Sequence, residues 1–405
     1  MRRRMRYALM LASVLLVPLA AFAGEIAADA TRQVEQYNFA IHIMAMLLVG
    51  FGFLMVFVKK YGYSATTGTY LVVGAGIPIY VLLRSTGIIS AEAVPAGSIK
   101  ALLLAEFACA SALIAMGAVL GRLRLYQYAM LALIVVPGYM INEWLVLDGR
   151  LGITKGFVDS AGSIIIHAFG AYCGLGLAIA LTSAKHLDQA VTSDETSDRF
   201  SMLGSMVLWL FWPSFCSAVV PHEQMPQTVM NTILSLCGAT MTTYIASSIF
   251  RKGKVLIGDI ANAALAGGVA IGATCNIVSP AVAFGIGALA GIVCVIGYAF
   301  VQPALQKAFK KIDTCGVHNL HGMPGIVGGL VAVLAVPGVA VAQLVGIVFT
   351  VIFALVVGLA GGYIIRVTGS VTEAYDDFAD FEGVPSPYLV DSEHEETPTL
   401  IPQKH

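Results

Sequence analysis

Long apolar blocks alternate with short polar joints along the sequence from residue 38 onward. Each block is long enough to cross a hydrocarbon layer of about 30 Å at a helical rise of about 1.5 Å per residue. Backbone polar groups in lipid must be bonded within the segment, so each block is predicted to be a helix. The predicted spans are 38–58, 66–86, 99–120, 126–146, 158–183, 200–219, 227–249, 256–276, 279–301, 317–335 and 340–365. The pattern predicts an all-α polytopic membrane protein with eleven transmembrane helices.

The N-terminal block has the composition of a processing signal. A basic start, MRRRMR, precedes the apolar run YALMLASVLLVPLAAF, which ends at Ala21-Phe22-Ala23. This order is typical of a cleavable signal peptide with a small-residue cleavage site. We therefore divide the chain into a signal peptide (1–23), a transmembrane domain (24–369) and a C-terminal tail (370–405). An uncleaved anchor is the alternative for the first part.

Positive charges collect at alternate joints. If the mature N-terminus is outside, the joints after odd-numbered spans face the cytoplasm. Those joints carry Lys59, Lys60, Arg122, Arg124, Lys185, Arg199, Arg251, Lys252, Lys254, Lys307, Lys310 and Lys311. The other joints carry only Arg150 and Lys155, with Arg84 and Lys100 just inside the neighbouring span ends. The positive-inside rule then predicts an inner (plasma) membrane protein with its acidic tail in the cytoplasm.

Composition narrows the function classes. The chain is 58% hydrophobic and 12% charged, with a formal net charge of -1 and a mean hydropathy of +0.83. Soluble domains carry about twice that share of charged residues. With no basic patch, nucleic acid is not expected as a partner, and the lipid bilayer is. The seven cysteines are scattered in apolar runs at spacings that match no metal motif, so neither a metal nor another cofactor is expected.

Ionisable residues inside the spans need a specific reason, because charge is costly in hydrocarbon. His167 lies in the fifth span and His321 in the tenth. Asp159 and Asp259 stand where spans begin, where a carboxylate can cap a helix N-terminus. Glu106 and Glu143 lie in the third and fourth spans, and the sequence does not choose a partner for Glu106.

The two histidines occupy corresponding spans of an inverted repeat. Spans one to five and six to ten run in opposite directions, and His167 and His321 each lie in the fifth span of their half. In such folds the functional site lies between the halves. Glycines near both histidines allow close helix packing. The alternative is that each histidine merely bonds two helices together.

Five motifs carry a resemblance to a known family. DTCGVHNLHGMPGIVGG, GSIIIHAFGAYCGLG, AEFACASALIAMGAVLGR, LWLFWPSF and NAALAGGVAIG resemble segments of Rh (Rhesus) proteins, a branch of the ammonium transporter superfamily. The resemblance covers about residues 38–385 and includes YDDFADF in the tail. It implies an ammonium-transporter-like fold with a 5+5 inverted repeat plus one helix, assembled as a homotrimer with one pore per subunit.

The resemblance also assigns roles to single residues. It implies that His167 and His321 form a pore-lining pair, with His318 outside the pair and toward the cytoplasm. Phe107 and Phe215 resemble the phenylalanines that close the outer pore, and we expect their rings to stack.

The resemblance extends to two acidic residues, and the chain differs from the family pattern at one position. Asp159 resembles the aspartate that precedes the first pore histidine, and Glu143 resembles an acid of the outer vestibule. Cys216 stands where the family usually has asparagine, so a polar contact behind the gate is in doubt.

The chemistry of a histidine-lined apolar pore favours a neutral solute. Placing an ion in such a pore costs on the order of 20 kcal/mol in the Born limit, whereas a neutral polar molecule costs a few kcal/mol. Walls such as Ile164 and Ile165 would reject K⁺, and neutral imidazoles would bond to NH3. We predict an ammonia/ammonium channel and no enzyme activity, with CO2 as a second candidate solute. An ion-coupled secondary transporter and a membrane metalloenzyme are the alternatives, but no charge pair near a span centre and no HExxH spacing supports them.

Overall fold

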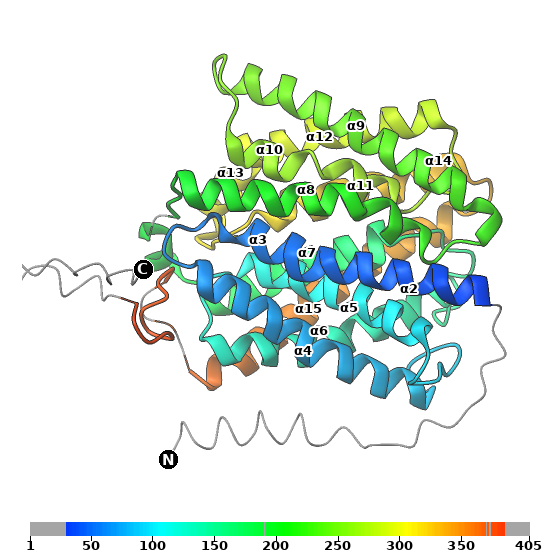
Figure 1. Cartoon of the computed structure of the whole chain (residues 1–405), viewed down its shortest axis with the longest axis horizontal. Helices are drawn as coiled ribbons and strands as arrows, with labels where there is room; N and C mark the ends of the chain where they lie inside the picture. The colour runs from blue at the N-terminus through cyan, green and yellow to red at the C-terminus, as the bar shows by residue number, and fades with distance from the viewer. Residues whose placement is uncertain (1–29, 190, 370, 372–373, 385–405) are drawn as a thin grey trace, which may run out of the picture.

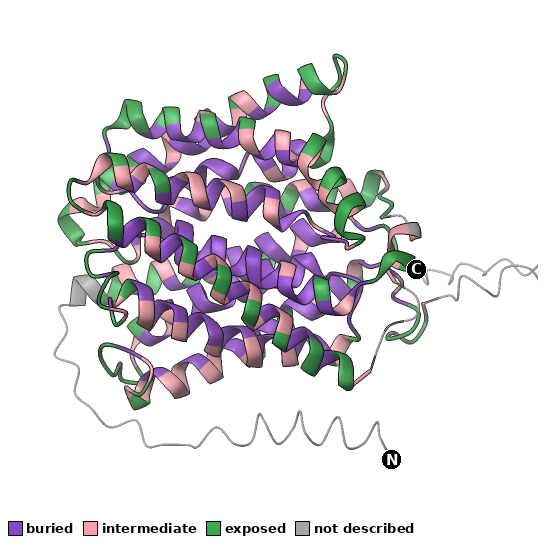
Figure 2. Cartoon of the chain, turned by 180° about the vertical axis from the view of Figure 1, so that it is seen from behind, coloured by how far each residue is buried: buried purple, intermediate pink, exposed green. Residues whose placement is uncertain are grey.

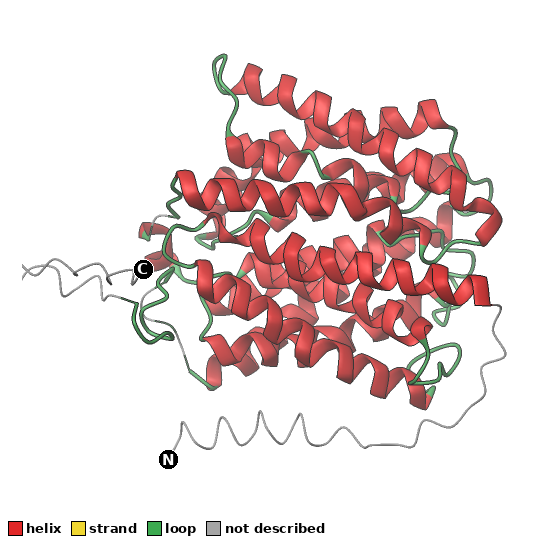
Figure 3. Ribbon diagram, in the orientation of Figure 1, coloured by secondary structure: helices red, strands yellow, loops and turns green. Residues whose placement is uncertain are grey.

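The structure, a computed structural model, describes residues 30–189, 191–369, 371 and 374–384. Within these residues every regular element is a helix (Figure 3). The predicted signal peptide and most of the predicted tail lie outside the described residues. The all-α prediction for the membrane domain is confirmed.

The first half of the chain supplies five crossings. The first runs through four consecutive helical pieces, and the fourth and fifth each join an α-helix to a π-helical segment. The elements are α2 (Ala30–Ala45), η1 (Met46–Phe51), α3 (Gly52–Leu54), η2 (Met55–Phe57), α4 (Gly62–Thr86), α5 (Ile99–Ala118), α6 (Leu125–Asn142), η3 (Glu143–Leu147), η4 (Ser163–Ala168) and α7 (Phe169–Leu181). A short helix, η5 (Ala184–Asp188), leads to the second half.

The second half repeats this arrangement and adds one helix. Its elements are α8 (Glu195–Ser217), η6 (His222–Gln224), α9 (Met225–Phe250), α10 (Ile257–Ala263), α11 (Ala266–Ile271), α12 (Pro280–Ile296), η7 (Gly297–Val301), α13 (Gln302–Phe309), η8 (His318–Gly322), α14 (Met323–Ala335) and α15 (Ala340–Val367). Nine helices of the described chain are long and apolar enough to cross a membrane. The other two predicted spans correspond to α10–α11 and to η8–α14, so eleven predicted spans have helical counterparts.

The eighth predicted span, 256–276, is not one helix. It breaks between α10 and α11, and its last residues form turns. Glycines explain the close packing there, since a Cβ at Gly267 would collide with the Ser235 carbonyl and one at Gly268 with the Trp212 ring. The break brings backbone groups of this segment toward Ser163, whose hydroxyl donates to Val269 O at 2.7 Å and accepts from Ala273 N at 2.8 Å.

Asp259 does not cap its helix. It lies inside the first turn of α10, where its carboxylate accepts hydrogen bonds from the Ser247 hydroxyl at 2.7 Å and from Arg251 Nε at 3.2 Å. The expectation from its position at the start of a span was therefore wrong. A charge-assisted contact to the end of α9 replaces the cap.

The fifth predicted span starts later than expected, at Ser163 instead of residue 158. Residues 158–162 cross the end of the bundle as an irregular segment. Gln343 of α15 holds it through two bonds of 2.9 Å to the N–H and C=O of Val158. The Gln343 side-chain amide thus satisfies the N–H and C=O groups of Val158, which would be bonded within the helix if the helix began at residue 158.

Buried residues concentrate in the helices at the middle of the bundle, as Figure 2 shows. α5 and α7 lie there, between α4 and α6 on one side and α8 and α11 on the other (Figure 1). α7 also packs along α15, where a Cβ at Gly358 would collide with the Cys173 carbonyl. Small residues thus set the close helix contacts around the segment that carries His167.

The described chain starts and ends at opposite ends of the bundle (Figure 1), as an odd number of crossings requires. Residues 374–384 pack onto the loops at the end of the bundle where the described chain ends. The Arg122 guanidinium lies 4.5 Å above the Tyr375 ring, and Nη2 donates to the Tyr375 hydroxyl at 3.0 Å. The Asp377 carboxylate accepts from Tyr63 N and Ser64 N at 3.0 and 2.8 Å, at the start of α4. This part of the predicted tail is therefore packed on the helical domain.

Candidate functional site

The structure brings His167 and His321 into direct contact at the centre of the bundle. Their Nδ1 atoms lie 3.2 Å apart, and their rings are nearly parallel, with an angle of 9° and centroids 5.3 Å apart. Both side chains are buried, with 2% and 5% of their surface exposed. A hydrogen bond between two Nδ1 atoms requires one of them to carry the proton and the other to accept it.

The same arrangement of side chain and backbone precedes each histidine. A carboxylate eight residues earlier accepts two backbone N–H groups at the start of the π-helical segment. Asp159 Oδ2 accepts from Ile164 N and Ile165 N at 3.0 and 2.7 Å. Asp313 accepts from Val317 N and His318 N at 3.0 and 3.1 Å. Orphan N–H groups of a helix start are satisfied in this way, and the negative charge faces the positive end of the helix.

A glycine three residues after each aspartate turns the chain into the helix. Gly162 has φ +80° and Gly316 has φ +69°. This left-handed conformation favours glycine, and a Cβ would also collide with Ile166 at the first site and with the Tyr298 ring at the second. π-Helical turns widen the helix locally and recur at functional sites.

Aromatic rings enclose the His167 side of the pair. Trp212 lies parallel to the His167 ring with centroids 5.6 Å apart, and Phe215 lies 6.1 Å from it. Both come from α8, three residues apart and therefore on one face. His167 Nε2 is buried and has no hydrogen-bond partner among the described residues. On the other side, Phe51 lies parallel to the His321 ring at 6.3 Å.

Phe107 and Phe215 meet edge to face, with centroids 4.6 Å apart and an interplanar angle of 76°. The expected stacked arrangement was wrong. The quadrupoles of two aromatic rings favour an edge-to-face contact over a sandwich. Both rings are buried; Phe215 lies beside His167, and Phe107 lines a cavity.

That cavity has a volume of about 400 Å³ and is lined in part by the segment 157–162, which follows η3. Its lining includes Phe107, Tyr139, Glu143, Asp159 and Ile165. Ile164 is not part of this lining, because its side chain packs against Gly329 of α14. We call this space the outer cavity.

A narrow passage continues from His321 toward the other end. A space of about 30 Å³ is lined by His321, Phe51 and Leu320. It shares Phe57, Asn262 and Cys315 with a wider cavity of about 470 Å³ that reaches Asp259 and Arg251. The histidine pair therefore lies between two cavities.

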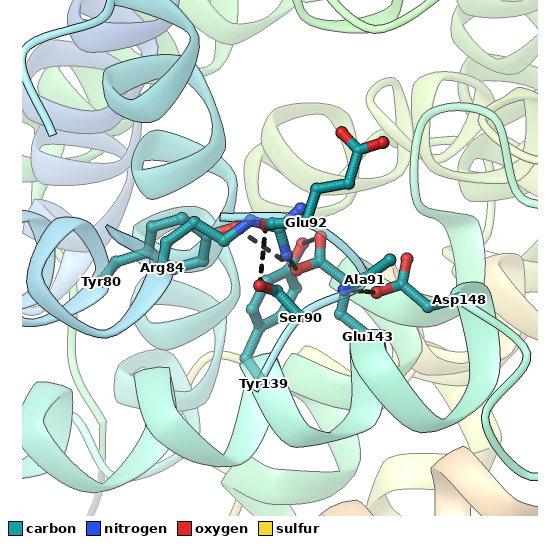
Figure 4. Close-up of polar contacts among 8 residues, drawn as sticks. All are labelled: Tyr80, Arg84, Ser90, Ala91, Glu92, Tyr139, Glu143 and Asp148. Carbon is teal, nitrogen blue, oxygen red and sulfur yellow. Dashed lines mark hydrogen bonds and ion pairs between the residues drawn. The ribbon is translucent and has the colours of Figure 1, made fainter. Parts of the chain in front are cut away.

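Glu143 lies at the start of η3, 7% exposed, on the wall of the outer cavity. Tyr80 and Tyr139 hydroxyls and Arg84 Nη1 donate to its carboxylate (Figure 4). Sequence reasoning predicted an acid of this kind, but it did not predict the arginine. Arg84 lies near the end of a span and not near its centre.

Comparisons with known proteins agree with this arrangement. Residues 8–377 match the family model for the Ammonium Transporter Family. The chain belongs to this family. It is 38% identical over 310 residues to ammonium transporter Rh type A of Canis lupus familiaris, covering 75% of this chain and 73% of the relative.

Solved structures give the same result. Nitrosomonas europaea Rh50, of the Rhesus protein family of channels, has a TM-score of 0.88 and 61% identity, covering 89% of this chain and 95% of that chain. Saccharomyces cerevisiae Mep2 has a TM-score of 0.69 at 16% identity, covering 84% and 85% of the two chains, and shows the fold alone. The chain is thus a multi-pass membrane protein and a bacterial-type Rh member of the Ammonium Transporter Family, with the predicted fold.

His318 does not face the pair in this Rh family member. It lies edge-on to Tyr172, with centroids 5.7 Å apart. It lines a separate, mainly apolar cavity of about 240 Å³ together with residues such as Leu175, Phe309 and Asp313. Its position supports the choice of His321 within HNLH.

Glu106 and the seven cysteines are two further sets of candidate residues in this chain. Both carboxylate oxygens of Glu106 are buried without a hydrogen-bond partner among the described residues. All seven cysteines are free, and the described residues contain no cluster of three or more His, Cys, Asp or Glu side chains that could hold a metal.

Trp212 is the contact of the pair that sequence reasoning missed. The motif LWLFWPSF was interpreted only through its resemblance to Rh proteins, and Trp212 was given no role. Trp212 and Phe215 nevertheless share a face of α8. A large aromatic side chain three residues before a gate candidate was the available signal.

Proposed function

We propose that this Rh family member conducts ammonia as neutral NH3, through a pore in which His167 and His321 supply the hydrogen bonds. The observation that carries the proposal is the Nδ1–Nδ1 contact of 3.2 Å between two buried rings that lie between an outer cavity and an inner passage. The ammonium transporter names of its relatives and its membership of the family support the choice of solute.

The pair suits a neutral guest because each ring keeps a nitrogen for it. When the two Nδ1 atoms share one proton, the Nε2 atoms remain available as donor or acceptor. His167 Nε2 has no partner within the described protein, and the His167 ring lies beside Phe215. Protonating both imidazoles would place two like charges together in a low dielectric, which is strongly disfavoured.

The remaining site residues take supporting roles in this proposal. Phe107 and Phe215 form the outer gate, and a guest must separate their rings to reach His167. Glu143 faces the outer cavity as the acidic group of the vestibule. Asp159 fixes the start of η4 and so the position of His167. No covalent step is involved, and the protein acts as a channel and not as an enzyme.

The proposal extends to assembly and placement. We propose a homotrimer in the inner (plasma) membrane, with one pore per subunit, the mature N-terminus outside and the C-terminus in the cytoplasm. The basic residues at joints after odd-numbered spans support this orientation. Reporter fusions decide it: a fusion after Lys254 is expected to be cytoplasmic and one at Glu92 external.

Flux into proteoliposomes tests the conducted species. At fixed total ammonium, raising pH raises NH3 and lowers NH4⁺, so the initial rate of internal alkalinisation is expected to follow NH3 without an electric current. A saturating, voltage-dependent current that follows NH4⁺ would replace NH3 passage by a mechanism in which the proton crosses separately. The same vesicles, challenged with CO2, show whether acidification exceeds that of protein-free liposomes.

The charge of the pair supplies a second test. His167→Asp places a carboxylate beside His321 and is expected to weaken discrimination against K⁺, because an anion in the passage favours cations. The control is His167→Ala, which is expected to lower NH3 flux and leave K⁺ excluded. Unchanged K⁺ exclusion in His167→Asp, at matched protein level, would contradict a pore position for His167.

A further inference from the structure

Three donors from two helices converge on the Glu143 carboxylate (Figure 4). From α4, Tyr80 OH donates to Oε2 at 3.3 Å and Arg84 Nη1 lies 3.5 Å from the same atom. From α6, Tyr139 OH donates to Oε1 at 3.4 Å. All four side chains are buried. The cluster therefore contains a buried ion pair with both carboxylate oxygens bonded.

The two charges of this pair are arranged in order from the cavity inward. Glu143 and Tyr139 line the outer cavity together with Phe107 and Asp159, whereas Arg84 and Tyr80 do not. The carboxylate thus lies at the cavity wall and the guanidinium behind it. A cation in the cavity is closer to the negative member of the pair than to the positive one.

The backbone of Arg84 is held by the end of α4 and by the loop that follows it. It lies in the last turn of α4, where a cation interacts favourably with the helix dipole. Gly87, with φ +69°, ends the helix, and Val94 N donates to Arg84 O at 3.3 Å, so that the following loop folds back over it. Ala91 N of that loop donates to Asp148 Oδ2 at 2.8 Å, which ties the loop to the residue after η3 (Figure 4).

We propose that Arg84 is a positioning residue that keeps Glu143 ionised at the wall of the outer cavity, where the carboxylate concentrates ammonium before it is conducted. This inference rests on the proposed function. A buried carboxylate without a counter-charge is neutralised by a proton instead of remaining charged. The Tyr80 and Tyr139 hydroxyls donate to the anion but carry no charge. The nearby Asp148 carboxylate adds repulsion, and Asp159 lines the same cavity, so neither replaces Arg84.

Four variants test the coupling by their concentration dependence. Arg84→Met and Glu143→Gln are each expected to raise the total ammonium concentration for half-maximal flux by about three- to tenfold, because the local cation concentration falls. Maximal flux is expected to stay within twofold, since the histidine pair is untouched. The double variant should match either single variant, and Arg84→Lys should remain near wild type.

Arg150→Met is the matched control. Arg150 is exposed in the loop after η3, so the variant removes the same charge at the same end of the bundle, away from the Glu143 carboxylate. It is expected to leave half-saturation unchanged. A wild-type half-saturation in Arg84→Met, no effect of Glu143→Gln, or a double variant whose effect is the product of the two would each overturn the proposal.

Infrared spectroscopy separates this inference from the proposed function. With carboxyl-labelled glutamate, the difference between wild type and Glu143→Gln is expected to contain an ionised carboxylate band. The difference between Arg84→Met and the double variant should contain a protonated carboxyl band instead. A protonated band in wild type overturns the role of Arg84. A wild type that conducts no ammonia overturns the proposed function and leaves the infrared result to decide the Arg84–Glu143 coupling.

Discussion

The segments 159–167 (DSAGSIIIH) and 313–321 (DTCGVHNLH) solve the same structural problem in opposite halves of the molecule. We call them the first and second segments. Each begins with an aspartate that bonds to a helix start, turns at a left-handed glycine and ends in the histidine of the pair. Equal spacing of Asp, Gly and His therefore accounts for the symmetric meeting of two rings from distant parts of the chain.

One difference between the segments bears on the choice of histidine: at the sixth position the first has Ile164 and the second has His318. Ile164 packs against Gly329, while His318 contacts Tyr172 beside a separate cavity. The same spacing of Asp, Gly and His thus carries different side chains at this position. The difference teaches that the shared Asp, Gly and His positions define the site, and that an additional histidine in one segment does not.

The largest expected effect separates His321 from His318. His321→Ala is expected to lower ammonia flux at least about tenfold, because it removes one hydrogen-bonding partner of the guest from an apolar passage. His318→Ala is expected to keep flux within twofold. The measurement is proteoliposome alkalinisation at matched protein content. Loss of flux in His318→Ala with flux retained in His321→Ala would reverse the assignment within HNLH.

The left-handed turns of the two segments, at Gly162 and Gly316, are expected to lose similar stability when the glycine is replaced by alanine. Gly162→Ala and Gly316→Ala each force a side chain into a left-handed conformation, at a cost of about 1–3 kcal/mol, and each also meets a neighbouring side chain. Thermal melting in detergent measures the loss. Gly152→Ala is the control, since Gly152 also has positive φ but open space around it. Equal melting temperatures for Gly162→Ala and Gly152→Ala would show that the contact with Ile166 contributes nothing.

A smaller effect concerns the aspartate of the second segment. Burial raises the pKa of Asp313 to about 6, and the N–H groups of Val317, His318 and Gly316 oppose this shift. Because the folded-state pKa lies above the unfolded value of about 3.9, the folded state binds more protons between these values, and stability falls as pH rises from about 4 to about 6.

The slope is at most about 1 kcal/mol per pH unit. Asp313→Asn is expected to remove this component from the pH dependence of the melting temperature. A variant with the same slope as wild type between pH 4 and pH 6 would assign the pH dependence to other groups.

The smallest expected effect comes from making the segments more alike. His318→Ile gives the second segment the residue that the first has at this position. Flux is expected to stay within twofold, because His318 lines a cavity away from the pair. A large loss of flux would show that the second segment uses its extra histidine and that the comparison fails at this position.

The sequence was sufficient for some features and not for others. Apolar block length located the helices and the polar residues within them, so His167 and the HNLH segment could be identified from the pattern of residues, whereas the choice of His321 over His318 came from the family resemblance. The break between α10 and α11 could not be predicted, because the partners of this segment are far away in sequence: Ser163 donates to Val269 O, and the Trp212 ring packs against Gly268.

Ring geometry and counter-charges depend on how the helices are placed in space. The edge-to-face contact of Phe107 with Phe215 depends on the relative position of α5 and α8, and the Arg84–Glu143 pair on that of α4 and α6. By contrast, the repeated Asp, Gly and His spacing was present in the sequence, but only three of nine positions carry it, so the repeat was not recognised beyond the histidines.

The near-parallel rings of His167 and His321 have a consequence for direction. Because they meet through the same atom of each ring, a guest arriving from either cavity would encounter one imidazole first and its partner second. The pair therefore imposes no preferred direction of passage. On the proposed function, the passage would carry ammonia down whichever gradient exists, and the cell would set uptake or release by consuming or producing ammonia on one side of the membrane.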